Sequence, residues 1–288
     1  MRRREPAVVR RPFDVDTVTS ADGTTIAWSR HGAGTPVVLV HGITESAATF
    51  DPVVERLLAH DPGFDVITLD LRGHGASGKA ATYDLAAMAG DVAAVIGAAG
   101  LLDHGTARRV HLVGHSLGGA VVSATGAAIP VASVVDIDQS LQLSAFKEQL
   151  VAAEAALRDP DQFGFVIEAM FETMGGPLLS ESERVRVGSN RHPEHDVVLG
   201  VWDLLLTAPE SDIAAAVDAA LAGYGDHPTP YLALFGIDPG PGYGEWIARR
   251  VPGAVVETWA DHGHYPHLVD PDRFVDRLLA FWVGSARG

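Results

Sequence analysis

One serine lies between glycines where a predicted strand meets a predicted helix. Residues 110–113 form an apolar run typical of a buried strand, and the small, apolar residues after position 119 predict a helix. Between them the chain reads Gly-His-Ser-Leu-Gly over residues 114–118. A turn this sharp strains the backbone of the serine, and glycines two residues before and after it remove the clash of a Cβ atom. We therefore expect Ser116 to be a nucleophile, with the Leu117 N–H placed to bind an oxyanion.

A serine nucleophile needs a base, and three histidines follow the last predicted strand. They are His262, His264 and His267, and their loop opens at the same edge of the sheet as Ser116. His264, directly after a glycine, is the best candidate for the base, with the other two as rivals. No carboxylate–histidine pattern with the spacing of metal ligands surrounds the three residues, so we expect no metal and no cofactor.

The carboxylate that orients the base should follow another strand. Asp238 comes just after the strand predicted over residues 230–235, and the chain order serine, aspartate, histidine is that of one known triad fold. Asp138, at the end of the strand predicted over residues 131–137, is the alternative acid. Asp136 is a further alternative, but within that strand we expect its side chain to point away.

The second oxyanion donor should come from the loop after the first buried parallel strand. There the chain reads His41-Gly42-Ile43, and the glycine allows the backbone to approach the site closely. We expect the Ile43 N–H to face the oxyanion, and His41 to brace the loop rather than act as a second base.

The segment of residues 73–80 resembles a phosphate-binding loop in part. Gly73 precedes Gly78-Lys79 at the spacing of a P-loop, after a predicted strand, but the next residue is Ala80 instead of serine or threonine. Since the magnesium ligand is missing, the segment predicts a tight loop and no nucleotide site.

The order of predicted elements indicates an α/β fold with a largely parallel sheet. An Asp-Gly turn joins the first two strands as a hairpin, and buried strands then alternate with helices. The pattern becomes purely helical over residues 141–228, which we interpret as a helical cap inserted into a main domain of residues 1–140 and 229–288. The expected strands cover residues 15–18, 24–30, 36–40, 64–69, 110–113, 131–137, 230–235 and 254–259; the expected helices outside the cap cover residues 47–60, 83–101, 120–128, 245–250 and 271–283.

Composition excludes several classes of protein. The net charge of −16 over 288 residues argues against nucleic-acid and anionic-membrane partners. The chain has no cysteine, so disulfides, thiolate metal sites and a cysteine nucleophile are impossible. The basic start lacks the apolar stretch of a secretory signal, and no apolar run is long enough to span a membrane, so we expect a cytoplasmic protein that acts on a small molecule.

Four motifs in this order resemble the α/β-hydrolase superfamily over essentially the whole chain. They are the residues at 41–43, Asp-Leu-Arg-Gly-His-Gly-Ala-Ser at 70–77, the serine motif at 114–119 and Gly-His followed by Pro266 and Leu268. The resemblance implies an eight-stranded, mostly parallel sheet, a cap over the pocket, Ser116 as nucleophile, His264 as base and the Ile43 and Leu117 amides as the oxyanion hole. Many relatives have Gly-x-x-Asp after the penultimate strand, whereas here Asp238 comes one residue earlier, which keeps Asp138 open. A serine followed by leucine at the turn disfavours the dehalogenases and epoxide hydrolases of the superfamily, which place aspartate there.

These residues predict hydrolysis of a carboxylic ester, lactone or thioester through an acyl-enzyme. In the cap, Phe171, Met174 and Trp202 are candidates to line a pocket for a small to medium, apolar substrate, although such residues also pack helices together. Three alternatives stay open: a carbon–carbon bond hydrolase or lyase with the same triad, a perhydrolase-type side activity, and a hydrolase-like protein that binds its ligand with little turnover.

Overall fold

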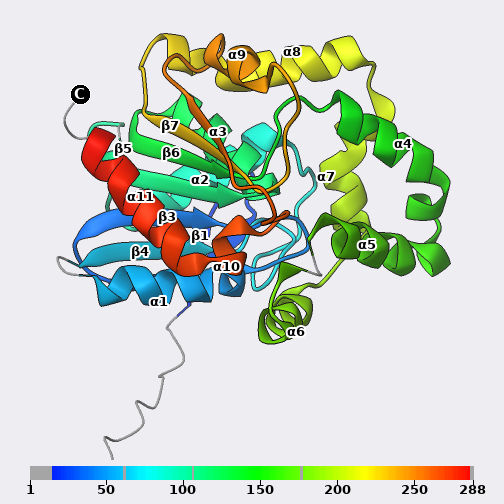
Figure 1. The fold of residues 1–288 in the computed structure, drawn as a ribbon, viewed down its shortest axis with the longest axis horizontal. Helices are drawn as coiled ribbons and strands as arrows, with labels where there is room; N and C mark the ends of the chain where they lie inside the picture. Colours follow the sequence, from blue (N-terminus) through cyan, green and yellow to red (C-terminus); the bar gives the residue numbers. More distant parts are fainter. Residues whose placement is uncertain (1–14, 61–62, 106, 176–177, 286–288) are drawn as a thin grey trace, which may run out of the picture.

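The computed structural model describes residues 15–60, 63–105, 107–175 and 178–285, and these form one eight-stranded sheet flanked by helices (Figure 1). The strand order is β1-β2-β4-β3-β5-β6-β7-β8, with β2 antiparallel to both of its neighbours and β3 to β8 parallel. The predicted fold class is therefore confirmed. The strands are β1 (Asp16–Thr19), β2 (Thr25–Gly32), β3 (Thr35–Val40), β4 (Phe64–Leu69), β5 (Ala107–His115), β6 (Val131–Ile137), β7 (Tyr231–Phe235) and β8 (Val255–Thr258).

The central strands are buried on both faces because helices cover both sides of the sheet. Alternate residues of β3 show this: Val38 and Val40 join one hydrophobic cluster, while Val37 and Leu39 join the other. The first cluster includes residues of α2 (Leu85–Ala98) and α3 (Leu117–Ala128), and the second includes residues of α1 (Asp51–Ala59) and α11 (Pro271–Ser285). The sheet thus has two cores, one on each face, as a continuous β-branched strand requires.

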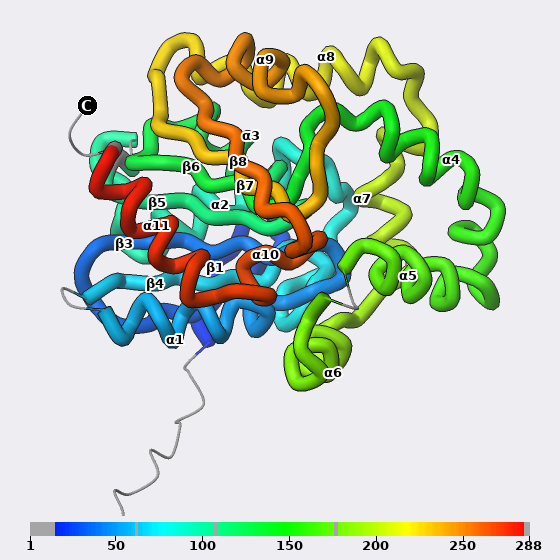
Figure 2. The backbone as a smooth tube through the Cα atoms, viewed as in Figure 1, coloured from blue at the N-terminus to red at the C-terminus, as the bar shows by residue number. Residues whose placement is uncertain are grey.

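In the described part of the chain, five α-helices and a 3₁₀ turn (Ala222–Gly225) lie between β6 and β7, within the segment predicted to be a helical insertion. The α-helices are α4 (Ser144–Arg158), α5 (Pro160–Met174), α6 (Glu181–Asn190), α7 (His195–Thr207) and α8 (Glu210–Leu221). Most of the buried residues of α4, α5 and α7 form a hydrophobic cluster of their own, which also takes in Ile43 from the loop after β3. Figure 2 shows α4, α5 and α7 together beyond one end of the strands. The insertion therefore packs over the carboxyl end of the parallel sheet, where the predicted site residues lie.

The ends of several elements differ from the prediction for local reasons. The first helix begins as a 3₁₀ turn (Ala47–Phe50) before α1. Helix α2 begins at Leu85, because the Asp84 side chain accepts the Ala87 N–H and caps it. Two short helices complete the described chain: α9 (Tyr243–Ala248), close to its predicted range, and α10 (Pro266–Val269), which the sequence pattern did not predict.

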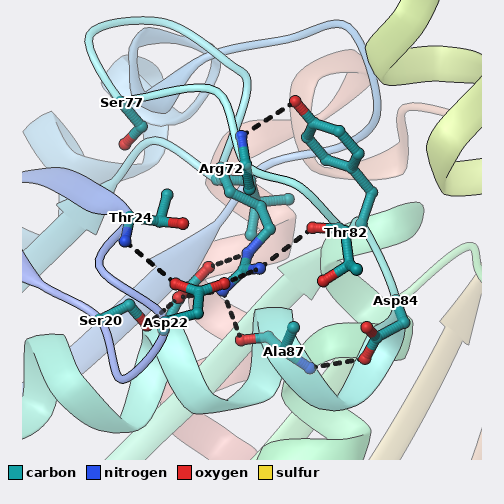
Figure 3. Close-up of polar contacts among 12 residues, drawn as sticks. Ser20, Asp22, Thr24, Arg72, Ser77, Thr82, Asp84 and Ala87 are labelled. Atoms are coloured by element: carbon teal, nitrogen blue, oxygen red, sulfur yellow. Dashed lines mark hydrogen bonds and ion pairs between the residues drawn. The ribbon is translucent and has the colours of Figure 1, made fainter.

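The loop after β4 is fixed by a buried arginine. Arg72 is 1% exposed; its guanidinium donates to both carboxylate oxygens of Asp91 at 2.6 and 2.7 Å and to Asp22 at 2.8 Å. Figure 3 shows the same side chain reaching the Thr82 carbonyl oxygen, at 3.0 Å. Arg72 therefore joins the β1–β2 hairpin to α2.

The P-loop-like residues have other partners. The Gly73 N–H donates to the Gly78 carbonyl at 2.9 Å, which closes the tight loop that the sequence predicts. Lys79 pairs with two carboxylates at the start of α7, Glu194 at 3.0 Å and Asp196 at 3.5 Å. This lysine therefore links the loop to the helical insertion.

No helix among the described residues is long and apolar enough to cross a membrane. The basic start of the chain, on which the expectation of no secretory signal depends, lies outside the described residues.

Candidate active site

The sharp turn predicted at Ser116 is present between β5 and α3. Ser116 has φ 52° and ψ −124°, a strained conformation for a residue with a side chain. A Cβ atom at Gly114 would lie 2.1 Å from the Gly118 carbonyl oxygen, and one at Gly118 would lie 2.1 Å from the Val40 carbonyl oxygen. Neither approach tolerates a side chain, so both glycines are required for the reason the sequence indicates.

His264 is held by the carboxylate at the end of β6. Its Nδ1 lies 2.7 Å from Asp138 Oδ2, and Asp138 Oδ1 accepts the backbone N–H groups of Gly236 and Ile237 at 2.7 and 2.9 Å. Because an ionised carboxylate only accepts hydrogen bonds, Nδ1 carries the proton. In the neutral ring Nε2 then has a free lone pair, which is what a general base needs.

The other nitrogen of His264 has no partner among the residues that the structure describes. Its Nε2 is buried, the residue is 3% exposed, and both His264 and Ser116 line the same cavity. The arrangement leaves the basic atom of the histidine free to take a proton at the end of the cavity where the serine lies.

Asp238, the first choice of acid, is not the carboxylate that contacts His264. It is exposed, and its Oδ1 accepts the Gly240 N–H at 2.8 Å. After β7 the shortened loop turns the Gly236 and Ile237 amides toward Asp138, while Asp238 turns back on its own loop. The prediction of Asp238 is corrected to its alternative, Asp138.

No hydrogen bond joins the remaining rivals to the site among the described residues. His262 Nδ1 hydrogen-bonds the Ala260 carbonyl oxygen at 3.1 Å, and His267 is buried beside His115 and Phe50. Burial lowers the pKa of His267 well below its ordinary value, so this ring is neutral. Asp136 accepts from the Tyr231 hydroxyl at 3.2 Å and, as expected, does not contact His264.

The two predicted oxyanion donors both line the cavity. Within the described part of the chain, neither the Ile43 nor the Leu117 N–H has a hydrogen-bond acceptor. Leu117 opens α3, where the first N–H groups of a helix have no acceptor inside the helix. Two amides without an acceptor among the described residues therefore belong to the wall of the cavity that Ser116 also lines.

A side chain that the sequence analysis missed braces the Ile43 loop. Glu45 is buried, and its Oε2 accepts the Gly42 N–H at 3.1 Å and faces His115 Nδ1 at 3.4 Å. Burial raises the pKa of Glu45, but the charge of His115 and its hydrogen bond outweigh this effect and hold the pKa well below the ordinary range. His115 Nε2 in turn donates to the His264 carbonyl oxygen at 2.8 Å. One chain of contacts thus connects the oxyanion loop with the loop of the base.

His41 has the bracing role that the sequence predicts. Its Nδ1 donates to the Gly42 carbonyl at 2.7 Å, and its Nε2 accepts the Leu71 N–H at 3.0 Å. Burial lowers the pKa of His41, so the ring stays neutral and both nitrogens are occupied.

The cavity has a volume of about 1340 Å³ and takes in the serine, the histidine, Asp138 and residues of the helical insertion. Phe171, Met174 and Trp202 line it, as predicted. Phe171 and Trp202 also belong to the hydrophobic cluster of the insertion, so they form the wall of the cavity and the core of the insertion together. The described residues contain no group of three or more His, Cys, Asp or Glu side chains that could hold a metal ion.

Comparison with known proteins agrees with this geometry. Residues 37–277 match the alpha/beta hydrolase family. The 2-(acetamidomethylene)succinate hydrolase of Mesorhizobium japonicum is 32% identical over 214 residues, which cover 71% of this chain and 71% of that protein. A non-heme haloperoxidase of Rhodococcus erythropolis is 38% identical over 107 residues, 37% of this chain and only 36% of that protein. An esterase from Rhodococcus sp. ECU1013 has a similar structure, with a TM-score of 0.67 at 25% identity over 93% of this chain and 98% of its own. The chain belongs to the alpha/beta hydrolase family.

Proposed function

We propose that the protein is a serine hydrolase that cleaves carboxylic esters through an acyl-enzyme on Ser116. One observation carries the proposal. His264 is oriented by Asp138 through Nδ1, while its buried, unpartnered Nε2 and Ser116 share one cavity. This is the relation that general-base activation of a serine requires.

The first half of the reaction forms the acyl-enzyme. Ser116 Oγ attacks the carbonyl carbon as His264 Nε2 takes its proton, and Asp138 stabilises the imidazolium that results. The Ile43 and Leu117 N–H groups bind the oxyanion of the tetrahedral intermediate. The intermediate collapses when the bond to the leaving oxygen breaks, and His264 returns the proton to the departing alcohol.

The second half returns the enzyme to its starting state. Water attacks the acyl carbon, His264 takes a proton from it, and the acid leaves as Ser116 regains its proton. Lactones and thioesters follow the same course, since each has a carbonyl carbon with an oxygen or sulfur leaving group. The aromatic and thioether side chains in the cavity wall favour an apolar substrate of small to medium size.

Perhydrolysis is a second candidate, favoured by the partial match to a haloperoxidase. The same acyl-enzyme then reacts with hydrogen peroxide instead of water and releases a peracid. Adding hydrogen peroxide to an acetate buffer and measuring bromide oxidation separates the two: an esterase alone gives no oxidised halide.

Turnover of simple esters tests the proposal. We expect the wild type to hydrolyse p-nitrophenyl acetate, butyrate and octanoate, and Ser116→Ala to lose a factor of about 10⁴ to 10⁶ in kcat. Ser189→Ala, which removes an exposed hydroxyl from α6, serves as the control and should match the wild type. If the wild type is no faster than Ser116→Ala on all three esters, the proposal is wrong, and carbon–carbon cleavage or ligand binding without turnover replaces it.

A further inference from the structure

The cavity at Ser116 does not end at the catalytic residues. It continues as a groove over α2, α3 and α8, which lie on the same face of the sheet (Figure 1). Helix α3 packs against both α2 and α8 and starts directly after the serine. Residues along the groove include Ala86, Gly90 and Ala93 of α2, Ala124 and Ala128 of α3, and Ala220 of α8.

The side chains that the three helices contribute to the groove are all small or apolar. Every residue that these three helices contribute to the cavity wall is alanine, glycine, leucine, methionine or valine. The chain as a whole has a net charge of −16 and 20% charged residues, so three helices that contribute no ionisable side chain to the wall contrast with the rest of the sequence. The carboxylates that line the cavity, Asp84, Asp138, Asp203 and Asp238, come from outside these three helices. None of the acidic side chains of these helices lines the cavity: Asp91 pairs with Arg72 in the interior, Asp218 pairs with Arg250, and Glu210 and Asp212 lie in the first turn of α8. Such a wall suits hydrocarbon and offers nothing to a polar or charged ligand.

The dimensions and the end point of the groove indicate what occupies it. Helix α3 has 12 residues, so from the serine to its last turn the groove runs for about 16 Å, the length of an extended chain of roughly ten or more carbon atoms. His264 lines the same cavity as Ser116; it is 3% exposed, and its Nε2 has no hydrogen-bond partner among the described residues. An occupant that fills the groove therefore reaches the reacting atoms, which indicates part of a substrate.

We propose that the groove of α2, α3 and α8 binds the straight hydrocarbon chain of an ester whose carbonyl carbon lies at Ser116. This proposal rests on the proposed function and specifies its substrate class as long-chain, unbranched esters. Small side chains along these helices leave room for a chain of methylene groups, and their apolar atoms contact it.

Gly90 offers a direct test. It is exposed in the middle of α2, it lines the cavity, and a Cβ atom there meets nothing within 4 Å. Gly90→Leu places a side chain in the groove and replaces a helix-weakening glycine, so the variant should fold. Gly164→Leu is the matched control, because Gly164 is also an exposed glycine inside a helix with open space around it, yet it does not line the cavity.

Kinetics with p-nitrophenyl esters from acetate to decanoate give the first readout. In the wild type, kcat/KM should rise about twofold per methylene, which corresponds to burying half of each CH₂ group. Gly90→Leu should lower the decanoate-to-acetate ratio of kcat/KM about tenfold or more, and Gly164→Leu should keep the wild-type ratio. The same series run with alkyl acetates tells whether the chain belongs to the acid or the alcohol of the ester. No rise with chain length in either series, or the same change in both variants, overturns the proposal.

A binding measurement tests the groove without requiring that the protein turn over an ester. cis-Parinaric acid is an unbranched fatty acid whose fluorescence increases in an apolar site. It should bind equally well to the wild type and to Ser116→Ala, and about tenfold more weakly to Gly90→Leu.

If the wild type cleaves no ester but binds this probe with that pattern, the proposed function fails and the groove remains a hydrocarbon site. If esters are cleaved but the probe does not bind, the groove proposal alone fails. If Gly90→Leu instead changes the oligomeric state on size exclusion and leaves chain-length preference unchanged, the groove is a contact between copies of the chain and the proposal is overturned.

Discussion

Asp138 and His264 lie 126 positions apart in the sequence and are joined by a hydrogen bond of 2.7 Å between Oδ2 and Nδ1. Asp138 follows β6, and His264 lies in the loop after β8. The loop after β7, the strand that lies between β6 and β8 in the sheet, contributes the Gly236 and Ile237 amides that occupy the other oxygen of the carboxylate. The ends of three neighbouring strands therefore fix the orientation of one imidazole.

Replacing Asp138 by asparagine and replacing Asp238 by asparagine should have very different effects on kcat. Asp138→Asn keeps the shape of the side chain but loses the charge that orients His264 and stabilises its protonated form. We expect kcat for p-nitrophenyl butyrate to fall by about 10³- to 10⁴-fold. Asp238→Asn should change kcat by less than about twofold, because its exposed carboxylate accepts the Gly240 N–H of its own loop and, among the described residues, has no hydrogen bond to His264. A larger loss in Asp238→Asn than in Asp138→Asn would contradict the assignment.

Removal of the Arg72 guanidinium should destabilise the whole fold. Arg72→Met leaves the Asp91 carboxylate, which is 0% exposed, without its charged partner. Breaking a buried pair in this way costs about 3 to 5 kcal/mol of unfolding free energy, measured by urea denaturation. Arg158→Met is the control, since its ion pair with Glu154 is solvent-exposed and worth less than about 0.5 kcal/mol. Equal losses of unfolding free energy in the two variants would show that the buried Arg72–Asp91 ion pair stabilises the fold no more than the exposed Arg158–Glu154 pair.

The stability of the protein should also depend on pH through Asp136. Burial raises the pKa of this carboxyl well above its ordinary value of 3.8, so the folded protein keeps it neutral while the unfolded chain ionises it. The contribution of Asp136 is therefore fully present below about pH 3.8 and is lost as the pH rises toward the folded pKa.

Asp136→Asn removes this dependence because an amide does not titrate. The Tm of the variant minus that of the wild type should increase between about pH 4 and pH 8 in differential scanning fluorimetry. A difference that stays level or decreases over this range would mean that the carboxyl is ionised in the folded protein.

Local chemistry explains why most of the fold could be predicted from the sequence. The glycines around Ser116 are required by backbone contacts within a few residues and across one neighbouring strand, so a short motif is enough to identify them. The buried strands are β-branched runs because both faces of the sheet are covered, and this also shows in the sequence.

The choice of acid could not be predicted in the same way. It depends on where the loop after β7 directs its amides. Both aspartates were visible in the sequence as candidates, but whether Asp238 or two backbone N–H groups would face the site depends on contacts between strand ends far apart in the chain.

Glu45 was missed for a related reason. It lies three residues after Gly42, and only the fold brings it beside His115, 70 positions away. The signal available in the sequence was an acidic residue in the oxyanion loop, whose burial no pattern of hydropathy reveals.

Trapping the acyl-enzyme tests most directly whether Ser116 is the nucleophile. The protein is mixed with p-nitrophenyl butyrate, quenched with acid within the first turnovers, digested and examined by mass spectrometry. We expect a butyryl group on Ser116 in the wild type, more of it in Asp138→Asn if deacylation is slowed more than acylation, and none at this position in Ser116→Ala. Consumption of the ester without a butyryl group on Ser116, or with the group on another residue, would contradict this role for Ser116.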